Sequence, residues 1–170
     1  VDRHLDIIKA IAPYCSYIVC EKPVVTNRAA LEVLLKLKKQ YNIKIFTVCQ
    51  KRYDPAITLA KKALFRGEKL KITVRKIRGT VYHGENDNIS RLLIYSQLPH
   101  YIDACMAITG SNLIYQKGEY QKNFNEVYPS FLTLEVLTED GRLCEIEIST
   151  CEDRNYPATI EISGQFFKKH

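Results

Sequence analysis

Long apolar segments are missing from this 170-residue chain. No run approaches the roughly 20 apolar residues that a helix needs to cross a bilayer, so the sequence excludes a membrane-spanning helix. The first residues also lack the basic start and the apolar stretch of a secretory signal peptide. Hydrophobic residues still make up 46% of the chain and charged residues 26%, which is typical of a soluble globular protein. Disorder, collagen and coiled coils are therefore disfavoured.

Cysteine pairs with metal-binding or redox spacing are also absent. The six cysteines, which are Cys15, Cys20, Cys49, Cys105, Cys144 and Cys151, include no CxxC pair. The sequence therefore indicates neither a zinc knuckle nor a thioredoxin-type site. Most of these residues lie in apolar runs, where free cysteine behaves as a small buried hydrophobic residue. We expect reduced core thiols, no metal site and a cytoplasmic protein.

The charge balance is moderately basic, because 25 Lys and Arg residues outnumber 19 Asp and Glu residues and give a net charge of +6. Such a charge favours solubility and anionic ligands in general, without identifying nucleic acid. A basic segment at residues 69–78 keeps nucleic-acid binding as one hypothesis. A solvated strand face or an anionic sugar-nucleotide ligand explains the same charges, and we expect no nucleic-acid partner.

Helix and strand patterns alternate over the first third of the chain. Apolar spacing predicts helices at residues 4–12, 27–41 and 55–66, and short apolar runs predict buried strands at 16–20 and 44–50. The helix at 27–41, capped by Thr26 or Asn27, is expected to turn Leu31 and Leu35 toward the core. This alternation is typical of a parallel sheet with helical crossovers.

The pattern then changes to strands. Alternation from Leu70 predicts a strand with a bulge near Lys76. A helix is expected from about Pro99 to Gly110. Further strands are predicted at residues 113–116, 130–137, 142–150 and 158–163, with a hairpin turn at Asp140-Gly141. These strands indicate an antiparallel sheet with one packed face.

Polar side chains follow both predicted parallel strands. Glu21-Lys22-Pro23 leaves the first strand, and the segment from Gln50 to Pro55 leaves the second. Because ligands bind at the carboxyl ends of parallel strands, Lys22, Gln50 and Arg52 are expected to converge on one crevice. The alternative is ordinary loop polarity.

A second candidate group lies on the predicted helix near residue 100. His100 and Asp103 are spaced i, i+3, so they share one helical face. His100 suits proton exchange near neutral pH, with Asp103 orienting its ring. The alternative is a surface histidine beside a solvated carboxylate. The other histidines, His4 among them, are expected to face solvent.

In this order, the motifs resemble the glucose–fructose oxidoreductase/inositol dehydrogenase (Gfo/Idh/MocA) family. A strand leads to Glu-Lys-Pro, the next strand leads to Gln-x-Arg-Tyr-x-Pro, and a His-x-x-Asp helix ends in Thr-Gly. The resemblance covers nearly the whole chain. It implies the C-terminal part of a Rossmann-like α/β sheet in residues 1–67. A mainly antiparallel, open α+β sheet with a packed helix would follow in residues 68–170, for substrate binding and dimerisation.

The resemblance implies an NAD- or NADP-dependent oxidoreductase that transfers hydride from or to a sugar, cyclitol or nucleotide-sugar. Lys22 would stabilise the alkoxide or relay its proton, and His100 would be the general acid or base. The implied cofactor-binding residues are Glu21, Lys22, Pro23, Gln50 and Arg52, and the implied substrate residues are Tyr53, Ser96 and Asp103. A homo-oligomer formed through the antiparallel sheet is also implied.

Two features depart from the family pattern. Ser96 stands where many members carry Asp, four residues before the helix histidine. The sequence also has no GxGxxG, the glycine-rich loop that binds the dinucleotide pyrophosphate. That loop would precede Val1, so we expect an N-terminally incomplete chain that is inactive alone. The competing hypothesis is a non-catalytic interaction or dimerisation module derived from such an enzyme.

Overall fold

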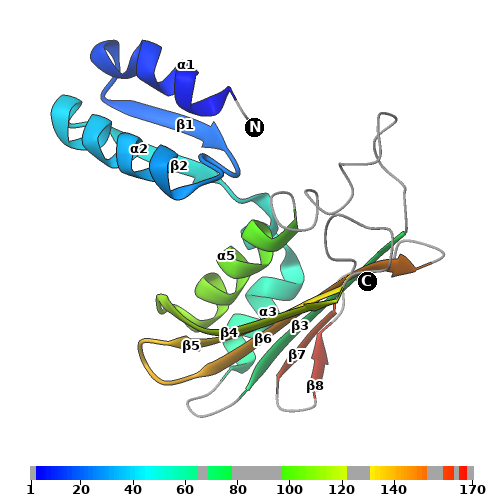
Figure 1. The fold of residues 1–170 in the computed structure, drawn as a ribbon. Helices are drawn as coiled ribbons and strands as arrows, with labels where there is room; N and C mark the ends of the chain where they lie inside the picture. The colour runs from blue at the N-terminus through cyan, green and yellow to red at the C-terminus, as the bar shows by residue number, and fades with distance from the viewer. Residues whose placement is uncertain are drawn as a thin grey trace. The chain divides into compact units, whose positions relative to one another are not determined.

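The computed structural model describes residues 3–64, 69–77, 97–121, 131–152, 159–162 and 165–167. The chain divides into two compact units, Val1–Cys49 and Gln50–His170, which are described separately (Figure 1).

The first unit contains two helices and a short parallel sheet. Its elements are α1 (His4–Ile11), a 3-10 turn (Ala12–Tyr14), β1 (Tyr17–Glu21), α2 (Arg28–Tyr41) and β2 (Lys44–Val48). β1 pairs in parallel with β2, from Tyr17 opposite Lys44 to Glu21 opposite Val48. The predicted alternation of helix and strand is confirmed here. α2 begins where a side chain caps it, because Asn27 Oδ1 accepts a hydrogen bond of 2.9 Å from the backbone N–H of Ala30.

The burial predicted for this unit is wrong on two surfaces. Tyr17 and Val19 of β1 are exposed, whereas Ile18 between them is buried. Successive side chains of a strand point to opposite faces, and the core formed with α1 and α2 covers the Ile18 side. Leu31 and Leu35 of α2 are also exposed, so this helix buries a narrower face than its apolar pattern predicted.

The second unit is a mixed sheet with helices on one face (Figure 1). Its elements are a 3-10 turn (Gln50–Tyr53), α3 (Pro55–Ala63), β3 (Leu70–Ile77), α5 (Leu98–Thr109), β4 (Leu113–Gln121), β5 (Phe131–Thr138), β6 (Leu143–Glu152), β7 (Thr159–Ile162) and β8 (Gln165–Phe167). Over the described residues the strand order is β4-β5-β6-β3-β7-β8. β3 and β6 pair in parallel, and the other pairings are antiparallel.

Several local predictions for this unit are confirmed. The pairing of β3 with β6 shifts register between Arg75 and Ile77, which is the expected bulge. Gly141 adopts a φ of 85° in the turn between β5 and β6, a conformation that glycine permits. Gly110, with a φ of 70°, ends α5. The strand β8 was not predicted. The fold class, a parallel α/β part followed by a mainly antiparallel sheet, matches the expectation.

The division between the two compact units falls after Cys49, and the domain boundary predicted after residue 67 stays a prediction. α3 belongs to the second unit, where Ala56, Ile57 and Ala60 are buried in one core with the inward residues of the sheet and α5. The apolar face of α3 is therefore satisfied by the sheet that follows it in the sequence. Residues 50–64 group with the sheet for this reason.

Candidate functional site

Lys22 lies directly after β1, at the carboxyl end of the parallel pair. Its peptide bond to Pro23 is cis. The residues from Lys22 to Asn27 form no helix or strand and connect β1 to α2. Lys22 is half-buried in this connection, and Glu21 before it is exposed. The first unit thus places an amine at the edge of the sheet where α/β proteins bind ligands.

The pKa of Lys22 is lowered from its ordinary value of 10.5. Burial is the largest cause, because removal from water disfavours the charged ammonium. Electrostatic interactions with Glu21 and Cys49 raise the pKa and partly offset burial. A lowered pKa brings a lysine closer to the range in which it exchanges protons, although a half-buried structural lysine shows the same direction.

His4 contacts the connection that carries Lys22. Its ring Nδ1 lies 3.0 Å from the carbonyl oxygen of Pro23. The prediction that His4 is isolated and faces solvent is therefore wrong, since the residue is partly buried at the start of α1. No local pattern signals this contact, because the two residues are 19 positions apart.

In the second unit, Arg52 and Asp103 form a forked ion pair. Arg52 Nε donates to Asp103 Oδ2 at 3.0 Å, and Arg52 Nη2 pairs with Asp103 Oδ1. The Asp103 side chain is only 16% exposed, so the fork is partly removed from water. Two parallel charge-assisted hydrogen bonds fix both position and orientation. The fork ties the Gln50–Tyr53 turn to α5, a role that the sequence did not assign to Asp103.

His100 lies in the first turn of α5 and is 4% exposed. The alternative of a surface histidine is therefore wrong, and the ring is shielded from bulk water. Tyr101 beside it is also buried. Burial, followed by the negative charge of Asp54, raises the pKa of Tyr101 to about 12. Sequence reasoning missed Tyr101 because an aromatic residue on a helix is ordinarily a core residue.

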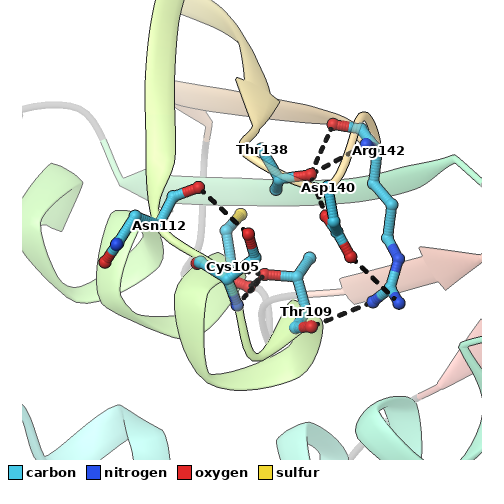
Figure 2. A network of polar contacts seen from close by, with 7 residues as sticks. Cys105, Thr109, Asn112, Thr138, Asp140 and Arg142 are labelled. Carbon is cyan, nitrogen blue, oxygen red and sulfur yellow. Dashed lines mark hydrogen bonds and ion pairs between the residues drawn. The ribbon is translucent and has the colours of Figure 1, made fainter.

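The far end of α5 is fixed by the turn between β5 and β6, as Figure 2 shows. Arg142 Nη1 donates to the carbonyl oxygen of Thr109, in the last turn of α5, at 2.9 Å. Arg142 also pairs with Asp140 at 3.2 Å, and its backbone N–H donates to Thr138 Oγ1 at 2.8 Å. The helix that carries the candidate residues is thus held by Arg52 near its middle, at Asp103, and by Arg142 at its C-terminal end.

The remaining predicted site residues are distributed between the two units. Gln50 and Tyr53 are exposed in the 3-10 turn of the second unit, whereas Lys22 belongs to the first unit. The convergence of Lys22 with Gln50 and Arg52 on one crevice therefore stays a prediction. Ser96 lies outside the described residues.

Metal and membrane sites receive no support from the described part of the chain. Within the ranges given above, no group of three or more His, Cys, Asp or Glu side chains is arranged to hold a metal ion. None of the described helices has the length and apolar character that crossing a bilayer requires. Five of the cysteines, at positions 15, 20, 49, 105 and 144, are free thiols.

The basic strand raised as a nucleic-acid surface carries local counterions. Lys71 Nζ lies 2.6 Å from Glu145 Oε1 and 2.8 Å from Glu147 Oε1. These ion pairs raise the pKa of Lys71 and keep it charged. The charge of Lys71 is therefore largely compensated by the neighbouring strand, which weakens the argument for a phosphate-binding surface.

Comparison with solved structures shows that the chain shares the fold of several dehydrogenases. A "probable dehydrogenase" from Thermotoga maritima has a TM-score of 0.79 at 20% identity, over 99% of this chain and 55% of that one. Myo-inositol dehydrogenase from Lactobacillus casei, solved with NAD(H) and myo-inositol, has a TM-score of 0.77 at 15% identity, over 98% and 52%. The WlbA dehydrogenase from Bordetella pertussis, solved with NADH and UDP-GlcNAcA, has a TM-score of 0.74 at 18% identity, over 96% and 54%.

The fold is therefore the one that the sequence resemblance implies, and the chain spans about half the length of these structures. No protein-family model and no curated protein matches the sequence. At such low identity the likeness concerns the fold, so the roles of individual residues depend on their own chemistry.

Proposed function

We propose that this chain contributes the proton-handling residues of an NAD(P)-dependent oxidoreductase that acts on a sugar, cyclitol or nucleotide-sugar. The observation that carries the proposal is Lys22, a half-buried amine with a lowered pKa at the carboxyl end of a parallel strand. The complexes of similar fold with NAD(H) and myo-inositol, and with NADH and UDP-GlcNAcA, support the cofactor and substrate classes.

The residues present suit the nicotinamide end of such a cofactor. Glu21 and Pro23 flank Lys22 at the sheet edge where ligands bind, and we assign them to the nicotinamide ribose pocket. We also assign Gln50, and Arg52 that forms the fork with Asp103, to the cofactor side of the site. The sequence lacks GxGxxG, so this chain does not supply the glycine-rich pyrophosphate loop. When bound, the nicotinamide supplies the hydride acceptor or donor.

The protein residues handle the proton of the same reaction. In oxidation, the carbinol carbon loses a hydride and its hydroxyl loses a proton as the carbonyl forms. Lys22 stabilises the alkoxide character of the oxygen or relays its proton. His100 accepts the proton as general base and returns it in the reverse direction. Tyr53 and Asp103 are assigned to the substrate side of the site.

Substitution of Lys22 in the longer parent enzyme, with its glycine-rich loop present, tests this assignment. We expect Lys22→Ala to lower kcat by about 10²-fold to 10⁴-fold, the usual contribution of a general acid or base, with little change in NADH affinity. Lys38→Ala removes a lysine from an exposed position of α2 and is the matched control. Near-normal turnover of Lys22→Ala with a native circular dichroism spectrum would remove the catalytic role.

The open face of the second unit favours an alternative function, a non-catalytic interaction module. α3 and α5 cover one face of the sheet, and no described helix of this unit lies on the other (Figure 1). That face carries charges of both signs, including Lys71, Lys117, Glu135, Glu145 and Glu161. A face of mixed charge can complement a second copy of itself, so we propose that the chain forms homo-oligomers through it.

Two measurements separate these functions. Saturable NADH binding by this chain in fluorescence titration supports the oxidoreductase, whereas an oligomer that shows neither NADH binding nor turnover even when the glycine-rich loop is present supports the module. Sedimentation at low and high salt tests the oligomer itself. We expect dissociation at high salt, because ion pairs at an exposed interface are screened.

A further inference from the structure

The connection between β1 and α2 contains the amine on which the proposed function depends. Its first residues follow β1, and Asn27 caps α2 at its end. Val24 and Val25 pack against the core of the first unit. Between these anchors, Pro23 offers a carbonyl oxygen to the ring of His4. This contact is the nearest fixed point to Lys22 on the C-terminal side.

Proline makes this contact especially restrictive. The pyrrolidine ring already limits φ of Pro23 to a narrow range. A hydrogen bond to the Pro23 carbonyl oxygen fixes the orientation of that peptide group and therefore restricts ψ, the other soft dihedral. The backbone of the residue that follows Lys22 is thus defined at both dihedrals. A lysine side chain has several rotatable bonds, so a fixed backbone is needed to present its amine to one place.

The chemistry of the two atoms also determines which ring nitrogen of His4 carries hydrogen. A carbonyl oxygen accepts hydrogen bonds and cannot donate them. At 3.0 Å from Pro23 O, Nδ1 must therefore be the protonated nitrogen. In the neutral ring, Nε2 is then without hydrogen.

From these contacts we propose that His4 is a positioning residue: its Nδ1–H donates to Pro23 O and holds the turn that presents Lys22. The proposal deepens the function proposed above and rests on it. His4 itself does not touch the reacting atoms in this role. It acts through the backbone of the Glu21–Pro23 turn.

The test uses three substitutions of His4 with different donor positions. His4→Asn keeps an N–H donor near the place of Nδ1, His4→Gln moves the donor toward the place of Nε2, and His4→Ala removes it. The primary readout is the pKa of Lys22, followed by NMR after ¹³C-reductive methylation and identified by its loss in Lys22→Arg. This readout needs neither cofactor nor substrate.

We expect His4→Ala to return the pKa of Lys22 toward its ordinary value, because a loosened turn exposes the amine to water. His4→Asn should retain the native pKa, and His4→Gln should resemble His4→Ala. In turnover, His4→Ala should lower kcat by about 10-fold to 100-fold, as expected when a reacting group is displaced by about 1 Å, while KM for the nicotinamide changes little. His4→Asn should restore kcat.

Three results would overturn the positioning role. An unchanged Lys22 pKa in His4→Ala would show that other contacts hold the turn. Rescue by His4→Gln and not by His4→Asn would show that the donor is Nε2 and not Nδ1. A ¹⁵N spectrum of the wild-type protein that shows hydrogen on Nε2 of the neutral ring would also contradict donation from Nδ1. This measurement remains possible even if His4→Ala does not fold. A changed Lys22 pKa with no NADH binding in a protein that also contains the glycine-rich loop would instead leave the positioning role standing and refute the oxidoreductase.

Discussion

Removal of Arg52 should destabilise the second unit more than neutralisation of Asp103. Their fork joins the Gln50–Tyr53 turn to α5, and its two sides differ in exposure, with 47% of the Arg52 side chain exposed against 16% of Asp103. Arg52→Met leaves a largely shielded carboxylate without its two donors. Asp103→Asn leaves a guanidinium that water can still reach, and the amide oxygen can still accept one hydrogen bond.

The expected magnitudes lie between two measured limits. Exposed ion pairs contribute about 0–1 kcal/mol to the free energy of unfolding, and removal of one partner from a buried pair costs about 3–5 kcal/mol. Since Asp103 is mostly covered but not fully buried, we expect Arg52→Met to cost about 2 kcal/mol. Asp103→Asn should cost about 1 kcal/mol, because water can solvate the guanidinium of Arg52 after the carboxylate is neutralised.

Urea unfolding of the full chain, followed by far-ultraviolet circular dichroism, measures these free energies. Amide hydrogen exchange in α5 assigns the loss to this helix. Arg28→Met is the matched control, because the Arg28–Glu32 pair is 92% and 60% exposed and should contribute less than about 0.5 kcal/mol. Equal losses for the two fork variants, or a loss for Arg52→Met no larger than for Arg28→Met, would refute the reasoning.

Further predictions concern single groups. Glu21→Gln should lower the pKa of Lys22 further, because Glu21 raises it, and NMR titration of the methylated amine measures this change. Tyr101 titrates near 12 when folded and near 10 when unfolded, so the unfolded chain releases this proton first and stability falls as pH rises from 10 toward 12. The full effect is about 2–3 kcal/mol, and Tyr101→Phe should show a correspondingly smaller alkaline loss in urea unfolding. Lys71→Met should lower Tm at low salt, because the substitution removes the ion pair of Glu145 and leaves this carboxylate beside others. The difference in Tm from the wild type should shrink in 1 M NaCl.

Element types in this chain follow from short-range chemistry, which is why they could be predicted. Asn27 accepts a hydrogen bond from the residue three positions later, and Asp54 accepts one from Ala56 at 3.1 Å. Gly141 supplies the left-handed conformation of a two-strand turn. Each of these signals involves residues within one turn of chain. A sequence displays such signals directly.

Burial and long-range contacts depend on neighbours that a local pattern does not specify. The apolar spacing of α2 correctly indicates a helix, but Leu31 and Leu35 remain exposed because the width of the covered face is set by the partner elements. Arg52 and Asp103 are 51 positions apart, and only the packing of α5 on its sheet brings them together. A surface position for His100 stayed open as an alternative because its burial also depends on neighbours that the local pattern does not specify.

The contacts around the candidate residues distinguish a catalytic role from a structural role better than the presence of Lys22 and His100 alone. In both units, a strong hydrogen-bond donor fixes the backbone or a carboxylate. His4 contacts the turn after β1, Arg52 contacts Asp103 in the middle of α5, and Arg142 contacts the C-terminal end of α5. A structural lysine or histidine needs no such fixed presentation, because packing alone satisfies it. Catalysis does need it, since small displacements of a reacting group cost much of the rate. If the chain is an oxidoreductase, loss of these donors should therefore lower kcat beyond the loss of folded protein, and a purely structural module would show only the loss of stability.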